Sequence, residues 1–525
     1  GWTDAELRHR AYPGGVTVFF SGPIDALYAA TEVNEWAWSA AADDVGAADS
    51  ADATTVEPLD EVLPRLRAAI EAERDPARLA LRDAAAAHGV TFLWDDDEVS
   101  VGSGSGSRTW PADALPAPED VSWAEIHDVP RVLVTGTNGK TTTVRMIASI
   151  VRAAGATPGF SCTDGIHVGD ELVDAGDWSG PGGARAVLRD RRVDVAVLET
   201  ARGGRLRRGL GVQRADGAIV TNVDADHLGE WGILTVEDVA TAKLVVRRAV
   251  VPDRPLTVNA DDPHLSTVAR GLGRPVTWIA VEETERARSE ASPGHPAWVA
   301  EDGWLVRVEP DPDGGEVAET RVAEISTIPA TMGGAALYNV SNALGAAVLA
   351  RALGYADDEI RRGLEAFDPT PENSPGRGNL FELGGVRVFV DFVHNPHGFR
   401  AIAQMAGRLE PTRVGVMIGQ AGDRDDDSIL GLARAAWSLQ PQHVAVKEMA
   451  HYLRGRERGE VTEMLRAELE GLGATAEQLS VHPDEVAAAR HLLAWSEPGD
   501  VIVLSTQEDR AGVLALVKGA DAASW

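Results

Sequence analysis

The sequence is nearly without cysteine and contains very little lysine. Cys162 is the only cysteine, so the chain cannot form an intrachain disulfide or a metal site built from several thiolates. Only four of the 49 basic residues are lysine, namely Lys140, Lys243, Lys447 and Lys518. In a chain that otherwise uses arginine, a retained lysine indicates a position that requires a compact ammonium or a reactive amine.

Long apolar runs are also missing. No run approaches the ~20 apolar residues that a membrane-spanning helix needs, and the N-terminus lacks the charged-then-apolar pattern of a signal peptide. The formal net charge of -32 argues against binding to nucleic acid or an anionic membrane, because both would be repelled. We therefore expect a cytoplasmic protein with neither of these partners. A homo-oligomer stays open.

The stretch from Arg131 to Gly155, RVLVTGTNGKTTTVRMIASIVRAAG, predicts a buried strand, a glycine-rich loop and a helix. Backbone N–H groups at the start of such a helix bind phosphate, and the helix dipole favours negative charge there. Lys140 would contact the outer phosphates and Thr141 a magnesium ion. The spacing G-x-x-G-K-T is two residues shorter than in the usual phosphate loop. This indicates a variant of the loop that a smaller group of proteins shares. The expected nucleotide-binding residues of this loop are Gly136, Thr137, Asn138, Gly139, Lys140, Thr141 and Thr142.

From 131 to about 365, strand-like and helix-like segments alternate, which predicts a parallel sheet covered on both faces. Polar residues follow the ends of its strands, where ligands gather in such sheets. Glu199 ends VDVAVLE, Asn222 ends GAIVTN, and His227 follows shortly after. Oxygen ligands suit magnesium, so Thr141 and Glu199 form a candidate metal site, with His227 as a less usual ligand. Short runs within 278–328 predict a small antiparallel sheet.

A second alternating unit follows the turn-rich segment PTPENSPGRGN. Its strands read VRVFVDF, RVGVMIG, HVAVKE and DVIVLST, which predicts a smaller doubly wound domain with Asp391 and His394 near a strand end. A hinge within 371–378 would let this domain close over a nucleotide. The sequence of the N-terminal third predicts a strand, helices and a hairpin-like pair of strands that ends in a flexible Gly/Ser tract. We identify no catalytic or binding motif there. The sequence thus predicts an α/β protein with three parts: a small α+β N-terminal domain with a connector (1–125), a central P-loop parallel-sheet ATPase domain (126–370) and a C-terminal Rossmann-like domain (371–525).

Many motifs of this chain resemble those of the Mur ligase superfamily, and within it the ligase module of cyanophycin synthetases. They run in order from about 131 to 508: GTNGKTTT, CTDGIHVGD, GDWSGPGGARAVL, VLETARGG, TNVDADHLG, NADDP, YNVSNALGA, NSPGRGNLFE, VDFVHNPHG and KEMAHYLRGR. The resemblance implies a central ATP-binding domain, a C-terminal Rossmann-like domain and ATP-driven joining of a carboxylate to an amine through an acyl phosphate. An amino acid or a peptide-like molecule is the implied substrate.

The resemblance also implies roles for single residues. Lys140, Glu199, His227 and Lys243 would be catalytic, with one or two magnesium ions held by Thr141, Glu199, His227 and Lys243. Lys243 falls where many members carry a lysine carbamylated by carbon dioxide, a modification that arginine cannot form. Asn222 would lie beside the γ-phosphate. Asn259, Arg377, Asp391 and His394 would complete the nucleotide site, with Asp391 on the ribose. Asp164, Asp177, Arg202 and Arg454 lie in motifs that would face the acceptor or the incoming amine, and Tyr338 stands where many members have histidine.

The N-terminal third departs from the cyanophycin synthetase pattern, because too few residues precede Pro130 to hold an ATP-grasp module. We therefore expect one ligation and not the alternation of two amino acids. Two alternatives stay open: another P-loop enzyme, such as a kinase or NTPase, and a non-catalytic nucleotide-binding partner subunit of another ligase.

Overall fold

The structure is a computed structural model. It describes residues 6–12, 15–44, 56–203, 209–225, 228–229, 232–311, 313, 315 and 317–522. The chain divides into two compact units. The first comprises Gly1–Val129 with Leu188–Arg192 and Gly229–Gly232, and the second comprises the remainder. Within the described part, no helix has the length and apolar character needed to cross a membrane.

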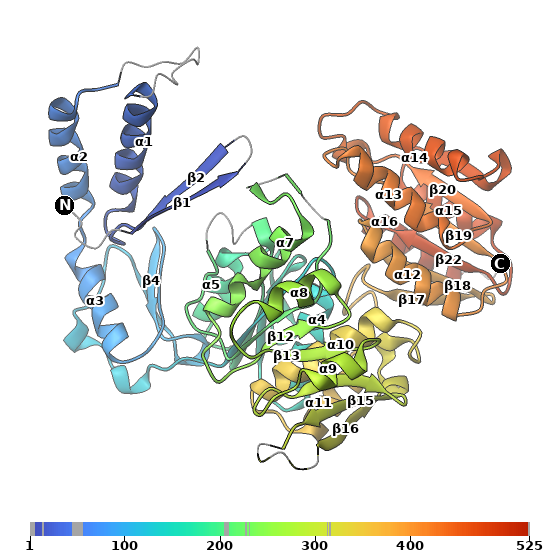
Figure 1. The fold of residues 1–525 in the computed structure, drawn as a ribbon, viewed down its shortest axis with the longest axis horizontal. Coiled ribbons are helices and arrows are strands. Elements are labelled where there is room, and N and C mark those ends of the chain that lie inside the picture. Colours follow the sequence, from blue (N-terminus) through green and yellow to red (C-terminus); the bar gives the residue numbers. More distant parts are fainter. Residues whose placement is uncertain are drawn as a thin grey trace. The chain divides into compact units, whose positions relative to one another are not determined.

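In its described residues, the first unit combines three α-helices with two small antiparallel sheets (Figure 1). Its elements are β1 (Leu7–Tyr12), β2 (Gly15–Phe20), α1 (Leu27–Asp44), α2 (Leu59–Glu73), α3 (Pro76–Ala87), β3 (Phe92–Trp94), β4 (Glu98–Val101) and β5 (Arg108–Pro111). β1 pairs with β2, and β4 lies between β3 and β5. Helix α3 begins after Asp75, whose side chain accepts a hydrogen bond from the N–H of Arg78.

The expectation of a flexible Gly/Ser tract in this unit was wrong. The segment between β4 and β5 is largely buried and contains a 3-10 turn at Gly104–Gly106. Ser103 N–H donates to the carbonyl of His127 at 3.0 Å. A Cβ at Gly106 would lie 2.4 Å from that same carbonyl oxygen. The glycine therefore permits a close backbone contact and does not indicate disorder.

The central part of the second unit is one eleven-stranded sheet in the order β16-β15-β14-β13-β12-β11-β6-β10-β7-β8-β9. The strands are β6 (Arg131–Thr135), β7 (Pro158–Cys162), β8 (Gly165–Val168), β9 (Glu171–Ala175), β10 (Val195–Glu199), β11 (Gly217–Val220), β12 (Leu256–Asn259), β13 (Thr277–Ala280), β14 (Ala297–Glu301), β15 (Trp304–Glu309) and β16 (Ala318–Glu324). The pairs from β7 through β10, β6, β11, β12 and β13 to β14 are parallel.

This sheet differs from the expected one because it is mixed. β8 and β9 extend one side in antiparallel fashion, and β15 and β16 extend the other. The small antiparallel sheet predicted within 278–328 is therefore not separate. β14 pairs with the edge of β13, with Ile279 opposite Trp298, so the antiparallel strands continue the main sheet.

One large apolar core joins the central sheet to the helices α4 (Lys140–Ala153), α10 (Leu337–Ala352) and α11 (Asp357–Ala366). The other described α-helices of this part are α5 (Pro181–Arg189), α7 (Val236–Lys243), α8 (Pro263–Arg270) and α9 (Thr284–Ser289). Helix α10 is buried along nearly its whole length, and small residues allow this close packing. At Gly345, for example, a Cβ would lie 2.2 Å from Ile219 of β11.

The C-terminal part forms a six-stranded sheet in the order β17-β18-β22-β19-β20-β21, drawn in orange and red in Figure 1. The four predicted strands are β18 (Val386–Asp391), β19 (Val414–Ile418), β20 (His443–Lys447) and β22 (Val501–Ser505). Sequence reasoning missed the antiparallel edge strand β17 (Asn379–Leu383) and the parallel edge strand β21 (Leu479–His482).

Five helices accompany this sheet: α12 (Pro396–Arg408), α13 (Asp426–Trp437), α14 (Glu460–Gly471), α15 (Glu485–Trp495) and α16 (Arg510–Ala522). One apolar cluster joins the sheet to α12, α13 and α14, and a second joins it to α15 and α16. Two such clusters on one mainly parallel sheet confirm the predicted doubly wound architecture.

Candidate active site

The loop between β6 and α4 requires glycine at two positions. Gly139 has φ 83°, and a Cβ there would lie 2.3 Å from Oδ1 of Asn342 on α10. A Cβ at Gly136 would lie 1.8 Å from Oγ1 of Thr221, just past β11. Both glycines therefore let the loop pass close to neighbouring side chains, and α4 begins directly after them at Lys140.

Lys140 and Thr141 lie in the first turn of α4. The Lys140 ammonium donates to the carbonyl of Thr137 at 2.9 Å. The Thr141 hydroxyl donates to Oε2 of Glu199 at 2.8 Å, which joins the start of α4 to the end of β10. Thr142, the next residue of α4, is half-buried.

The amide of Asn222 holds the other side of the loop. Its Oδ1 accepts from the N–H of Asn138 at 2.8 Å, and its Nδ2 donates to the carbonyl of Asn138 at 3.1 Å. The carbonyl of Asn222 also accepts from the N–H of Thr137 at 2.9 Å. Asn222 therefore directly contacts the glycine-rich loop between β6 and α4 (the phosphate-type loop).

Lys243, the last residue of α7, reaches the same loop. Its side chain is buried, and Nζ donates to the carbonyl of Gly136 at 2.8 Å. The loop thus receives two of the four lysines of the chain, Lys140 from its own helix and Lys243 from a distant one.

Glu199 is nearly inaccessible to solvent, with 2% of its surface exposed. Burial raises the pKa of its carboxyl group, although the Lys140 charge and the Thr141 hydroxyl act in the opposite direction. A divalent cation would compensate this buried carboxylate, and the surrounding hydroxyl and carboxylate oxygens are the ligands that magnesium prefers. The residues present therefore fit a magnesium ion. Among the described residues, no three His, Cys, Asp or Glu side chains form a metal cage, so phosphate oxygens and water would complete the shell.

Sequence reasoning missed two neighbours of this site. The Thr163 hydroxyl, in the turn after β7, lies 2.9 Å from the Thr141 hydroxyl and 3.4 Å from Oε1 of Glu199. Asn342 lies against Gly139, and its Nδ2 donates to Oδ1 of Asn339 at 3.0 Å. A polar residue directly after a buried parallel strand was the available signal for Thr163. Two asparagines in the first turns of the apolar helix α10 were the signal for Asn342.

Arg377 lies next to Thr163, and its Nη2 donates to the threonine hydroxyl at 3.4 Å. Its guanidinium also lies over the Phe392 ring, 4.7 Å from the centroid. The neighbouring Asp164 meets three arginines: Arg510 at 3.1 Å, Arg145 at 3.5 Å and Arg377 at 3.8 Å. Burial alone would raise the pKa of Asp164, but Arg377, Arg510 and Arg145 outweigh it and hold the pKa below its usual value.

Asp391, Asn259 and His394 make other contacts in the structure. Asp391 accepts from the N–H of Gly378 at 2.8 Å, and burial raises its pKa to about 6. The Asn259 side chain donates to the carbonyl of Thr221 at 3.1 Å, behind the loop. His394 Nδ1 lies 3.2 Å from the carbonyl of Phe392. Their assignment to the nucleotide stays a prediction.

One further contact links the loop to the C-terminal part of the chain. The amides of Asn138 and Asn395 exchange two hydrogen bonds, at 3.1 and 3.0 Å. Nδ2 of Asn138 also lies 3.0 Å from Nδ1 of His397. Asn395 additionally caps helix α12 by accepting from the N–H of Gly398 at 2.8 Å. Sequence reasoning did not assign Asn395 to the site.

The remaining candidates are less informative. His227, a predicted metal ligand, lies outside the described residues. Asp177 accepts from the N–H and hydroxyl of Ser179, which is a local turn, and Arg454 pairs with Asp423 at 2.6 Å. Arg202 is buried. The roles of these residues stay predictions.

Two family models match parts of the chain. Residues 134–350 match the Mur ligase middle domain, and residues 376–507 match the Mur ligase, glutamate ligase domain. The cyanophycin synthetase of Nostoc sp. (strain PCC 7120) is 36% identical over 393 residues, which are 74% of this chain and 43% of that protein. The chain thus spans less than half the length of this relative. The UDP-N-acetylmuramate--L-alanine ligase of Nocardioides sp. is 25% identical over 71% of this chain and 69% of its own length.

Solved structures show the same fold. The FolC protein of E. coli in complex with DHPP and ADP aligns with a TM-score of 0.51 at 21% identity, covering 75% of this chain and 89% of that one. MurF from Acinetobacter baumannii aligns with a TM-score of 0.51 at 18% identity, covering 74% and 77%. The chain therefore contains the middle domain and the glutamate ligase domain of the Mur ligases.

Proposed function

We propose that this protein is an ADP-forming ligase that joins an amino acid or another amine to a carboxylate of an amino-acid or peptide-like substrate. The observation that carries this proposal is the contact between the first turn of α4 and the buried end of β10. Thr141 and Glu199 meet there at 2.8 Å beside Lys140. This arrangement combines a phosphate-binding helix start, a cation and a carboxylate that favours a metal ion.

The reaction proceeds in two steps. An oxygen of the substrate carboxylate attacks the γ-phosphorus of ATP, so that an acyl phosphate forms and ADP leaves. The amine then attacks the carbonyl carbon, inorganic phosphate leaves with the former carboxylate oxygen, and the nitrogen loses a proton. The first step is opposed by repulsion between the carboxylate and the triphosphate.

Residues of the chain lower this barrier by neutralising the negative charge of the phosphates. Lys140 neutralises the outer phosphates, and the backbone N–H groups that begin α4 orient them. Thr141 and Glu199 would hold a magnesium ion, which would supply charge neutralisation at the phosphates when bound. Lys243, through its hydrogen bond to Gly136, fixes the backbone of the loop. Its carbamylation, and a second metal ion held by it and His227, are part of the proposal.

The experiment is a screen for ADP release with ATP, magnesium and a library of amino acids and short peptides. The proposal predicts release that requires both a carboxylate substrate and an amine. Release that ignores the amine would favour an NTPase. ADP binding with no release for any pair would favour a non-catalytic subunit. The Lys140→Ala variant serves as the control, since removing a preformed cationic donor should lower turnover by about 100-fold or more.

A further inference from the structure

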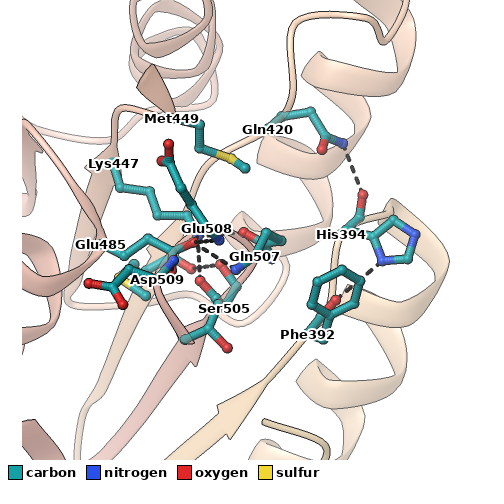
Figure 2. A network of polar contacts seen from close by, with 12 residues as sticks. Phe392, His394, Gln420, Lys447, Met449, Glu485, Ser505, Gln507, Glu508 and Asp509 are labelled. Atoms are coloured by element: carbon teal, nitrogen blue, oxygen red, sulfur yellow. Dashed lines mark hydrogen bonds and ion pairs between the residues drawn. The ribbon is translucent and has the colours of Figure 1, made fainter. Parts of the chain in front are cut away.

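Lys447 is one of the four lysines of the chain, and the reaction described above does not use it. It ends β20, and its side chain is 0% exposed. Nζ donates to Oε1 of Glu485 at 2.5 Å, to the carbonyl of Ser505 at 2.5 Å and to the side-chain oxygen of Gln507 (Figure 2). These three acceptors match the three N–H donors of the ammonium, so every donor of the buried charged group is hydrogen-bonded.

The absence of a side chain at Gly419 leaves room for the stem of this lysine. A Cβ at Gly419, directly after β19, would lie 2.5 Å from Cγ and 2.7 Å from Cε of Lys447. Glycine is thus required there by the lysine stem. An arginine could not replace the lysine, because its planar guanidinium cannot direct donors to three acceptors grouped around one point.

Glu485 completes the pair and holds the loop that follows β22. Its carboxylate accepts from the backbone N–H groups of Gln507 at 2.7 Å, Glu508 at 2.9 Å and Asp509 at 2.8 Å. Burial alone would raise the pKa of Glu485, but Lys447 and these N–H donors outweigh it and hold the pKa below its usual value. The buried pair therefore fixes both the side chain and the backbone of this loop.

The loop in turn holds the segment that follows β18. The Gln507 amide donates to the carbonyl of Val393, and the N–H of Thr506 donates to the carbonyl of Asp391 at 2.8 Å. Gln420 supports the same segment by donating to the carbonyl of His394 at 3.0 Å (Figure 2). Asn395, two residues beyond Val393, is the residue that bonds Asn138 of the phosphate-type loop.

We propose that Lys447 is a positioning residue for the nucleotide site. Through Gln507 it fixes residues 391–395, and so places Asn395 against Asn138. This inference rests on the proposed function, in which the loop that contains Asn138 binds the phosphates of ATP. Lys447 then acts on nucleotide affinity from the C-terminal sheet without touching the nucleotide.

Three variants test the inference. Lys447→Met removes the ammonium and keeps an apolar stem that extends as far as Cε. Lys447→Met combined with Glu485→Gln also removes the unpaired buried charge, which should restore most of the thermal stability. Lys518→Met is the matched control, because Lys518 is exposed and pairs only at the surface with Glu372.

ADP binding in the presence of magnesium is measured by calorimetry, and hydrogen exchange is followed at 391–395 and 505–509. The single and double variants should both bind ADP at least tenfold more weakly and exchange faster in both segments, and Lys518→Met should change neither. Recovery of ADP affinity together with stability in the double variant would overturn the inference, as would unchanged exchange at 391–395. If the unaltered protein does not bind ADP, the proposed function fails by itself, and hydrogen exchange still decides whether Lys447 holds the segment.

Discussion

At the scale of single residues, Glu199 has the property most relevant to the proposed reaction. Its carboxyl group is buried at the end of β10, and burial raises its pKa. The folded protein therefore binds a proton at Glu199 more readily than the unfolded chain does. The ionised group costs stability, and this cost grows as the pH rises above the ordinary value of 4.5. A bound cation would compensate this buried charge, so the site is suited to bind a cation.

Glu199→Gln should consequently raise stability and abolish activity. The neutral amide removes the cost of burying a charge, so without metal or nucleotide at pH 7.5 the thermal midpoint should rise by about 2 °C or more. ADP release should fall by about 100-fold or more. Differential scanning fluorimetry with and without magnesium and ATP provides the test. A lower midpoint for the ligand-free variant would show that the carboxylate stabilises the free protein, contrary to this account.

The same carboxyl group predicts a pH dependence for metal binding. Protons compete with magnesium for Glu199 at a higher pH than they would at an exposed glutamate, because burial raises its pKa. The magnesium concentration that gives half-maximal ADP release should therefore rise as the pH falls toward 4.5. Magnesium titrations at several pH values measure this. A requirement that does not change with pH would argue against Glu199 as a ligand.

The sequence was sufficient for the residues whose position follows from a strand end. Glu199 ends β10 and Asn222 lies two residues beyond β11, and both strands are parallel neighbours of β6. Glu199 contacts Thr141 at the start of α4, and Asn222 contacts Asn138 of the loop. It was not sufficient for Asn395, which lies 257 positions from its partner Asn138. That contact depends on packing between distant segments, and no local periodicity encodes it.

At the scale of elements, the loop before α4 depends on two properties of Gly139, its left-handed backbone and its contact with Asn342. Gly155, after α4, has nearly the same backbone conformation, with φ 85° against 83°, but no atom lies within 4 Å of its Cβ position. A substitution at Gly155 therefore introduces backbone strain alone, whereas the same substitution at Gly139 introduces backbone strain and a steric collision.

Gly155→Ala should cost only the strain of a left-handed alanine, about 1 kcal/mol, and leave ADP affinity unchanged. Gly139→Ala should carry the same strain and also displace Asn342 or the loop, so ADP affinity should fall at least tenfold. Urea unfolding and ADP titration of both variants measure the difference. Equal ADP affinities would contradict the requirement for a close approach at Gly139.

Element prediction succeeded where periodicity was strong and failed at sheet edges. The buried runs of β18, β19, β20 and β22 were all found as strands. β21 was missed because none of its four residues is fully buried, so its pattern resembles that of a loop. Joining β14 to β13 required knowledge of which edge was free, and the alternating pattern of 297–324 carries no such information.

At the scale of the whole molecule, Asp164 joins several parts of the second unit. It follows β7 of the central sheet and pairs with Arg145 of α4, with Arg377 in the segment between the two sheets, and with Arg510 at the start of α16. Removing one partner of a buried ion pair typically costs about 3 kcal/mol, because the remaining charges lose their compensation.

Asp164→Asn should therefore lower the free energy of unfolding by about 3 kcal/mol near neutral pH. Because the three arginines hold the pKa of Asp164 below its usual value, this contribution is present above pH 3.8 and is lost as the pH falls through the lowered pKa. Asp170→Asn is the control: Asp170 is 91% exposed and pairs with Arg152 at the surface, so its loss should cost less than about 1 kcal/mol. Equal costs for both variants in urea unfolding would contradict the joining role of Asp164.

The molecule matches its relatives over only part of their length. The family models cover 134–350 and 376–507, and the cyanophycin synthetases are matched over about 43% of their sequence. The segment Gly1–Val129, which makes up most of the first unit, lies outside both models. Among the described residues of this segment, no group of three His, Cys, Asp or Glu side chains is placed to hold a metal ion.

The central claim is that one carboxylate is activated as an acyl phosphate and then joined to an amine. The most direct measurement uses a substrate carboxylate labelled with ¹⁸O, taken from the pair that the ADP-release screen identifies. The account predicts that one labelled oxygen appears in each inorganic phosphate released and that the amide keeps the other. Unlabelled phosphate formed together with the amide product would contradict it.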